Sequence, residues 1–180
     1  MDIPVELVPL ACIRCGTFVP AQADEVAWVC AQCGQGLALD EDRGLISLDV
    51  HHSDSIPANS KGKPFWVAEG RLALQRETYG SFGARSAEAQ KFWGQPRSFF
   101  VPAYSCPLET RLQMGIKYLA DPPSLSLGPP TPFEPVTLAS RDVKSLAEFV
   151  IMAVEAGRKD NLKEVHLTLE LSDPVLWILP

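Results

Sequence analysis

The same five-residue cysteine motif occurs twice in the N-terminal part of the chain. CIRCG begins at Cys12 and CAQCG begins at Cys30. Two residues between the cysteines of each pair let a tight turn direct both sulfurs at one metal ion. The glycine that follows easily adopts a left-handed conformation. Four thiolates in a tetrahedron are a ligand set that suits zinc. The spacing therefore predicts that one Zn²⁺ is bound by Cys12, Cys15, Cys30 and Cys33.

A site with four cysteine ligands leaves no position for water or substrate, so the predicted zinc is structural. Its binding free energy then contributes to folding a module too small to have a core of its own. Iron is the alternative metal, but the two cysteine pairs of rubredoxins lie much further apart in sequence. No catalytic residue is predicted at this site.

The two motifs resemble the knuckles of zinc ribbons of the transcription-factor-B and RNA-polymerase-subunit type. From FWVAEG through RSFFVPAYSCPLE to the C-terminal end, the chain resembles uncharacterised bacterial proteins that carry an N-terminal ribbon. The resemblance implies a metal-binding ribbon over about a quarter of the chain, and it implies no catalytic residue. The sequence contains no Walker motif, so it does not support a helicase function.

Charge is distributed unevenly along the chain. The formal net charge is −6, and residues 1–42 carry all of it, with seven acidic residues against Arg14 alone. Nucleic-acid binding normally needs lysine and arginine to replace the counterions of phosphate. An acidic ribbon is therefore a poor nucleic-acid ligand, and we expect its partner to be another protein.

We expect a cytoplasmic protein. The longest apolar stretches are shorter than the roughly 18 residues of a membrane span. The N-terminal end, MDIPVELVPL, has an acidic residue where a signal peptide would carry lysine or arginine. In a reducing compartment, five cysteines indicate metal binding rather than disulfides.

Composition and periodicity divide the chain into three parts and predict an α+β fold. We expect a zinc ribbon at residues 1–50, a polar linker at 51–63, and a domain of mixed strands with about three helices at 64–180. A proline-rich connector at 121–135 interrupts that domain, because proline excludes both a continuous helix and a central strand.

Several elements of the second domain can be predicted individually. Alternating apolar residues predict strands at 65–78, with a bend or bulge at Gly70, and at 165–171. A short strand is expected at 136–138, and 175–179 is typical of a buried strand. Helices are expected from Ser86 to Trp93, after Pro107, and from an N-cap at Ser140 to a C-cap at Gly157.

Other residues have the chemistry of a site without a supporting pattern. Cys106 precedes a predicted helix, where a thiol pKa can be lowered, but no histidine or asparagine lies near it in sequence. We therefore interpret it as a structural cysteine. His51 and His52 are adjacent, and adjacent histidines rarely bind one ion, even with Asp54 nearby. We expect them in a solvated loop, and we expect His166 on a strand surface.

One region combines aromatic and basic residues. A platform for stacking bases could use Trp66, Phe92, Trp93, Phe99 and Phe100, flanked by Arg71, Arg76, Arg85, Lys91 and Arg97. Acidic residues are interspersed, so we expect core aromatics beneath a mixed surface. The favoured function is a non-enzymatic adaptor or assembly subunit. The first alternative is nucleic-acid binding or transcription regulation through residues 61–97, and the second is an enzyme with Cys106 as nucleophile.

Overall fold

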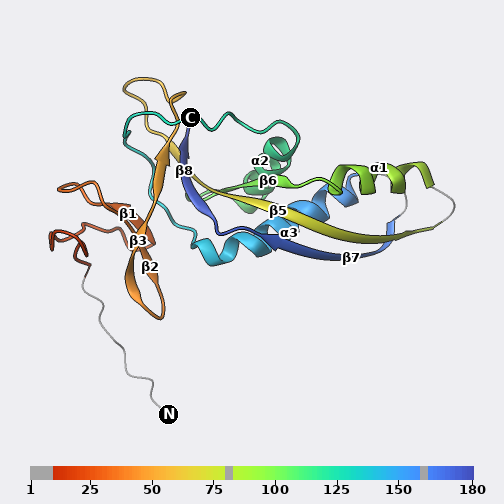
Figure 1. Cartoon of the computed structure of the whole chain (residues 1–180), viewed down its shortest axis with the longest axis horizontal. Coiled ribbons are helices and arrows are strands. Elements are labelled where there is room, and N and C mark those ends of the chain that lie inside the picture. The colour runs from red at the N-terminus through yellow and green to blue at the C-terminus, as the bar shows by residue number, and fades with distance from the viewer. Residues whose placement is uncertain (1–9, 80–82, 159–161) are drawn as a thin grey trace, which may run out of the picture.

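The computed structural model describes residues 10–79, 83–158 and 162–180, and its fold is α+β (Figure 1). A three-stranded sheet near the N-terminus is followed by a mixed five-stranded sheet with three helices. In chain order, the elements are β1 (Ala27–Val29), β2 (Gly36–Asp40), β3 (Gly44–Leu48), β4 (Val50–His52), β5 (Lys63–Thr78), α1 (Gly83–Trp93), β6 (Arg97–Pro102), α2 (Leu108–Ala120), the short 3₁₀ helix η1 (Ser140–Asp142), α3 (Val143–Ala156), β7 (Leu162–Leu171) and β8 (Val175–Leu179).

The small sheet has the order β1-β2-β3 and is antiparallel throughout. Its middle strand, β2, begins two residues after the second cysteine motif. Gly36, the first residue of β2, allows an unusually close approach of the chain. A Cβ atom there would lie 2.2 Å from the Leu48 carbonyl oxygen, so only glycine fits without a shift of the backbone.

The strand β5 organises the large sheet. Its first part pairs with β6 on one side and β8 on the other, and its second part pairs with β7. The change of partner occurs at Gly70, which lies opposite both Arg97 and Leu171. A Cβ atom at Gly70 would lie 2.6 Å from the Phe99 ring. The glycine expected to mark a bend or bulge in β5 therefore marks the point along β5 where pairing with β6 stops and pairing with β7 starts.

The strands β7 and β8 follow the same edge of β5 with a one-residue change of register. Gly70 lies opposite Leu171, whereas Val67 lies opposite Val175, so the β7–β8 side contains one additional residue. Such an insertion reverses the alternation of side chains. As a result, Leu169 in β7 and Leu176 in β8 are both buried on the sheet face that also carries Trp66.

That face is covered by α1 and α3, which pack with α2 around one buried cluster. The cluster contains Ala89, Trp93, Phe99, Leu119, Ala147, Val150, Ile151 and Leu169. Among the described residues, the opposite face is covered along the first part of β5 by a second cluster that includes Phe65, Phe100 and Tyr104. Beyond Gly70, the side chains of β5 and β7 alternate between sheltered and solvent-facing positions, as the sequence periodicity predicted.

The helix ends differ from the predictions in detail. The first helix begins at Gly83, three residues before Ser86. Pro107 is the N-cap of α2 rather than its first helical residue. Ser140 does not cap α3, because η1 intervenes and the N-cap is Asp142. Gly157 is the C-cap of α3 as predicted, in a right-handed conformation. The expected strand at 136–138 is reduced to a bridge between Val136 and Ala27.

The polar segment 51–63 is more ordered than a simple linker. Its first two residues belong to β4, which pairs in parallel with β8. The proline-rich connector crosses the same segment, through backbone hydrogen bonds from Asp54 to Ser126 and from Gly128 to His52. The connector therefore packs along the domain as a stiff extended chain, while the domain boundary itself stays a prediction. Within residues 10–79, 83–158 and 162–180, no helix is long and apolar enough to cross a membrane.

Candidate metal centre

The two cysteine motifs fold into matching turns. In the first, the Gly16 amide donates to the Cys12 carbonyl at 2.8 Å, and in the second the Gly34 amide donates to the Cys30 carbonyl at 2.8 Å. Gly16 has φ +75° and Gly34 has φ +72°, the left-handed conformation predicted for both glycines. The sequence repeat is thus a structural repeat, because each turn is determined by local hydrogen bonds.

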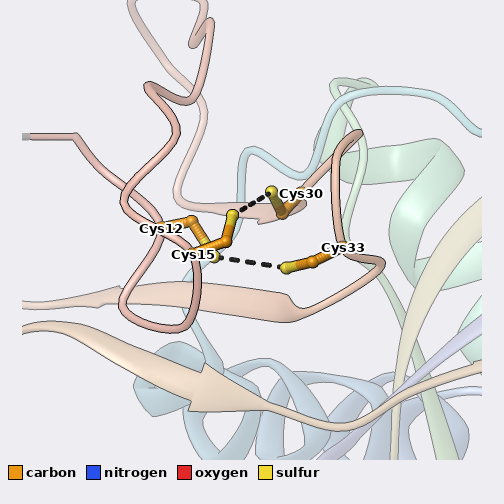
Figure 2. Close-up of side chains that lie close together, drawn as sticks. All are labelled: Cys12, Cys15, Cys30 and Cys33. Atoms are coloured by element: carbon orange, nitrogen blue, oxygen red, sulfur yellow. Dashed lines mark hydrogen bonds between the residues drawn. The ribbon is translucent and has the colours of Figure 1, made fainter.

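The turns bring the four sulfur atoms together (Figure 2). The Sγ atoms of Cys12 and Cys33 are 3.6 Å apart, as are those of Cys15 and Cys30. All four lie within 4.8 Å of one another. A tetrahedron with metal–sulfur distances of about 2.3 Å has sulfur–sulfur edges of about 3.8 Å, which these distances approach. A disulfide would need about 2.05 Å, so the cysteines are free thiols arranged around one point.

Hydrogen bonds and burial give these thiols unequal acidity. The hydroxyl and the backbone N–H of Thr17 lower the pKa of Cys15 to about 6. Burial disfavours ionisation of Cys12, but the N–H groups of Cys15 and Arg14 outweigh it and lower the pKa of Cys12. At Cys33 the Gln35 N–H favours the thiolate, yet burial and the neighbouring sulfurs raise its pKa to about 12.

Repulsion between neighbouring sulfurs contributes to the raised pKa of Cys33. Four thiolates in contact repel one another, so the chain alone stabilises some of them at the expense of others. A dication at the centre removes that repulsion and allows all four to ionise. The residues therefore form a group that can hold one metal ion. Cys12 and Cys30 are buried beside Trp28 and Leu37, whereas Cys15 is exposed.

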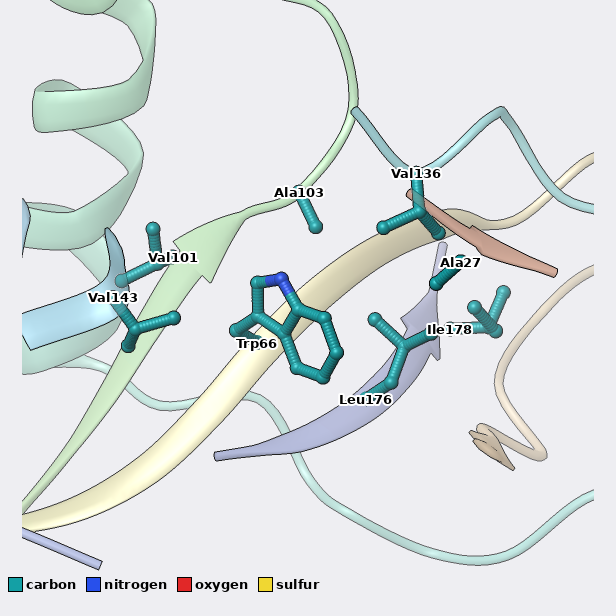
Figure 3. Close-up of a cluster of buried hydrophobic side chains, with 8 residues drawn as sticks. All are labelled: Ala27, Trp66, Val101, Ala103, Val136, Val143, Leu176 and Ile178. Atoms are coloured by element: carbon teal, nitrogen blue, oxygen red, sulfur yellow. The ribbon is translucent and has the colours of Figure 1, made fainter. Parts of the chain in front are cut away.

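The small three-stranded sheet of the metal-binding module contacts the large domain. The Val26 amide donates to the Val136 carbonyl at 2.8 Å, and Ala27 lies opposite Val136. Ala27 belongs to the same buried cluster as Trp66 and Ile178 (Figure 3). An exposed ion pair between Arg141 and Glu41 adds a second link. We call this contact, made by Val26, Ala27, Val136 and the Arg141–Glu41 pair, the ribbon seam.

The histidines do not form a second metal site. His52 is buried, its Nδ1 accepts a hydrogen bond from the Thr131 amide at 3.2 Å, and burial lowers its pKa. His51 stacks on Trp177, with ring centroids 5.0 Å apart. Both therefore belong to β4 rather than to a solvated loop, because β8 and the connector enclose that strand. Among the described residues, the four cysteines are the only candidate metal-binding group.

The other residues considered as site candidates occupy structural positions, either in a buried cluster or on a strand surface. Cys106 packs against the cluster of Phe65 and Phe100, and His166 faces solvent on β7. Of the proposed stacking aromatics, Trp66, Trp93, Phe99 and Phe100 are at most 3% exposed. They cannot stack on bases while the domain is folded. Phe92 is partly buried beneath the guanidinium of Arg97, and the side chain of Arg85 lies outside the described part of the chain.

Sequence reasoning missed one buried polar cluster. Glu155 on α3 is fully buried and accepts a hydrogen bond from the Trp93 indole N–H at 2.7 Å. It also pairs with Arg76 on β5 and with Arg158. Glu155 lies at a position that continues the spacing of buried residues along α3, and Arg76 does the same along β5. Two opposite charges at positions predicted to be buried could therefore have indicated a buried ion pair from the sequence.

Comparisons with known proteins do not extend these assignments: no protein-family model, curated protein or solved structure matches the chain. The structure has a four-cysteine cluster beside a small antiparallel sheet, an arrangement consistent with a zinc ribbon, joined to an α+β domain.

Proposed function

We propose that this chain is a zinc-binding, non-enzymatic adaptor or assembly subunit, in which Zn²⁺ is purely structural. The observation that carries the proposal is the closed group of four cysteines on a sheet that packs into the core of the larger domain. Four protein thiolates fill the tetrahedron, so the metal has no position left for a substrate. The zinc would instead fix the shape of the surface that surrounds it.

That surface has the composition of a protein-binding site. The first cysteine turn displays Ile13, which is 55% exposed, and Phe18, two residues after the turn, is 80% exposed. Beside Phe18 is a cavity of about 370 Å³ whose lining includes Trp28, Phe133 and Lys61. An exposed aromatic next to a partly apolar cavity is typical of protein-contact surfaces. Another protein with an apolar anchor would suit this site.

Nucleic-acid binding stays the alternative, and it has less support. The stacking residues it would need are buried, and the ribbon is acidic. Binding would have to use phosphate contacts alone, which give strongly salt-dependent affinity.

The test is a tagged pull-down from native cells with nuclease treatment, followed by mass spectrometry. The variants are Cys12→Ser/Cys33→Ser, which removes the metal site, and Phe18→Ser/Ile13→Ser, which keeps it. Leu108→Ser serves as control, since Leu108 is 55% exposed but lies on α2, in the larger domain. We expect stoichiometric partners that are lost with both double variants and retained with the control. Recovery of nucleic acid in place of protein, or equal recovery with all variants, would contradict the proposal.

A further inference from the structure

Two hollows adjoin where the metal-binding module meets the connector. The first is the cavity of about 370 Å³ beside Phe18, and the second, of about 780 Å³, lies against the segment that precedes β1. Three residues line both hollows, namely Glu25, Glu134 and Pro135. One wall is made by residues 17–31 and the other mainly by residues 132–137, where the connector passes β1 (Figure 1). We call this continuous depression the junction groove.

The two ends of the junction groove differ in chemistry. The end beside the first cysteine turn has an apolar lining that includes Phe18, Val19, Pro20, Trp28 and Phe133. The other end is lined by the acidic residues Asp24, Glu25 and Glu134, and no lysine or arginine of the described chain lines it. Lys61, at the apolar end, is the one base in the described lining of the whole groove. Three acidic side chains therefore face a single basic one.

The three carboxylates are not equally occupied. The Glu25 Oε2 atom accepts hydrogen bonds from the Gln22 backbone N–H at 2.7 Å and from the Trp28 indole N–H at 3.1 Å, so this carboxylate also supports the wall of the groove. Among the described residues, the carboxylates of Asp24 and Glu134 have no hydrogen-bond or ion-pair partner. A concave site with apolar walls and charges of one sign concentrates the electrostatic field and attracts the opposite charge.

We propose that the junction groove binds an extended segment of another protein, which inserts an apolar side chain beside Phe18 and places lysine or arginine residues against Asp24 and Glu134. The inference rests on the proposed adaptor function and names the chemistry of its partner. Burial of the apolar anchor would supply most of the affinity, while the complementary charges would select the partner.

Charge distinguishes this occupant from the others that could reach the groove. Nucleic acid carries phosphates, which the three carboxylates repel. Residues 1–9 of the chain itself contain Asp2 and Glu6 and no lysine or arginine, so their charge is not complementary. A second copy carries the same net charge of −6, which opposes association of two copies. A basic segment of a different protein fits the groove better than any of these.

The first test is ligand selection on the zinc-loaded full chain. The probe is a library of random peptides of about twelve residues displayed on phage, a length that suits an extended segment in a groove. We expect the enriched sequences to combine a large apolar residue with several lysine or arginine residues. Enrichment of acidic sequences, or no enrichment, would overturn the proposal.

The second test locates the selected peptide by charge exchange, measured by fluorescence anisotropy. Asp24→Lys/Glu134→Lys should weaken binding by about tenfold or more, because like charges then meet. A peptide in which glutamate replaces the basic residues should bind this variant, which also shows that the variant is folded. Asp42→Lys/Asp49→Lys is the matched control, since it changes the net charge equally at exposed positions outside the groove. Equal weakening by both variants, or no binding of the exchanged peptide, would refute the assignment to the groove.

The nuclease-treated pull-down separates this inference from the proposed function. Partners lost with Phe18→Ser/Ile13→Ser but retained with Asp24→Lys/Glu134→Lys would support the adaptor function and refute the basic segment. Partners retained with both variants would contradict both proposals. Sedimentation velocity gives the remaining outcome: a wild-type dimer that Asp24→Lys/Glu134→Lys dissociates would identify a second copy as the occupant and overturn the assignment to another protein.

Discussion

The Nε atom of Arg76 lies 2.9 Å from Oε2 of Glu155, and the two side chains are 1% and 0% exposed. This pair joins the far half of β5 to the last turn of α3. The Trp93 indole and Arg158 contact the other carboxylate oxygen, so α1 is attached to the same group. A single buried carboxylate thus connects three elements.

Removing Glu155 should destabilise the domain strongly. Glu155→Ala removes the buried carboxylate that Arg76, Arg158 and the Trp93 indole contact, which we expect to cost about 3–5 kcal/mol in the free energy of unfolding. Arg76→Met/Glu155→Leu should be less destabilised than Glu155→Ala, because it removes both charges. Urea denaturation followed by circular dichroism measures both. Glu148→Ala, on a solvent-accessible stripe of the same helix, is the control, and an effect of equal size there would contradict the assignment.

The metal site should bind one zinc ion per chain. Cys12→Ser should lose the metal, since three thiolates bind zinc less tightly than four. Cys106→Ser, which changes the one cysteine outside the cluster, should retain it. Elemental analysis after gel filtration gives the stoichiometry. Loss of zinc from the Cys106 variant, or retention by the Cys12 variant, would be inconsistent with a four-cysteine site.

In the zinc-free protein, the cysteines should differ in their reactivity toward alkylation, because their thiol pKa values differ. The folded turn lowers the pKa of Cys15 to about 6, so it favours the thiolate. This stabilising effect is complete above the ordinary thiol pKa, decreases as pH falls, and is lost below about pH 6. The thiolate is the nucleophile in alkylation. Cys15 should therefore react with iodoacetamide at a rate that rises with a midpoint near pH 6, while Cys33 stays unreactive at neutral pH.

Peptide mass spectrometry of the alkylated chain assigns the rates to individual cysteines. Zinc-loaded protein is the control and should be protected at all four. A Cys15 midpoint near 8.5 would mean that the turn does not keep its geometry without metal.

The two parts of the ribbon seam should contribute unequally. Val136 is fully buried, and Val136→Ala should cost about 2 kcal/mol because it leaves a cavity. Arg141→Ala should cost less than about 1 kcal/mol, because the Arg141–Glu41 pair is exposed to solvent. Thermal unfolding with zinc present measures the difference. A larger effect at Arg141 would reverse this ranking.

The features that were predictable from the sequence are those encoded within a few residues. Each cysteine turn closes through hydrogen bonds inside its own motif, so spacing and one glycine were sufficient. The spacing of apolar residues in α3 and in β7 depends only on which face of the element is buried, so it could be read from the local sequence. The start of α1 differed from the prediction by three residues, whereas its end at Trp93 was predicted correctly. The N-cap of α3 is Asp142 rather than Ser140, because η1 precedes the helix.

The features that were not predictable depend on partners far along the chain. Nothing in the sequence near Gly70 specifies that β5 stops pairing with β6 there and starts pairing with β7. The enclosure of His52 requires both β8 and the connector. The one-residue register change between β7 and β8 becomes visible only when both strands lie along β5. Arg76 and Glu155 each lie at a position where the spacing of apolar residues predicts burial. Pairing them, however, required knowing that β5 and α3 are in contact.

The parallel pairing of β4 with β8 has a consequence for the order of folding. Contacts around the cysteines join residues close in sequence, whereas β4 finds its partner only after nearly all of the large domain has been made. Local contacts form faster than distant ones. We therefore expect the metal-binding turns to assemble on the ribosome first, and the large sheet to close in a later step that β8 completes.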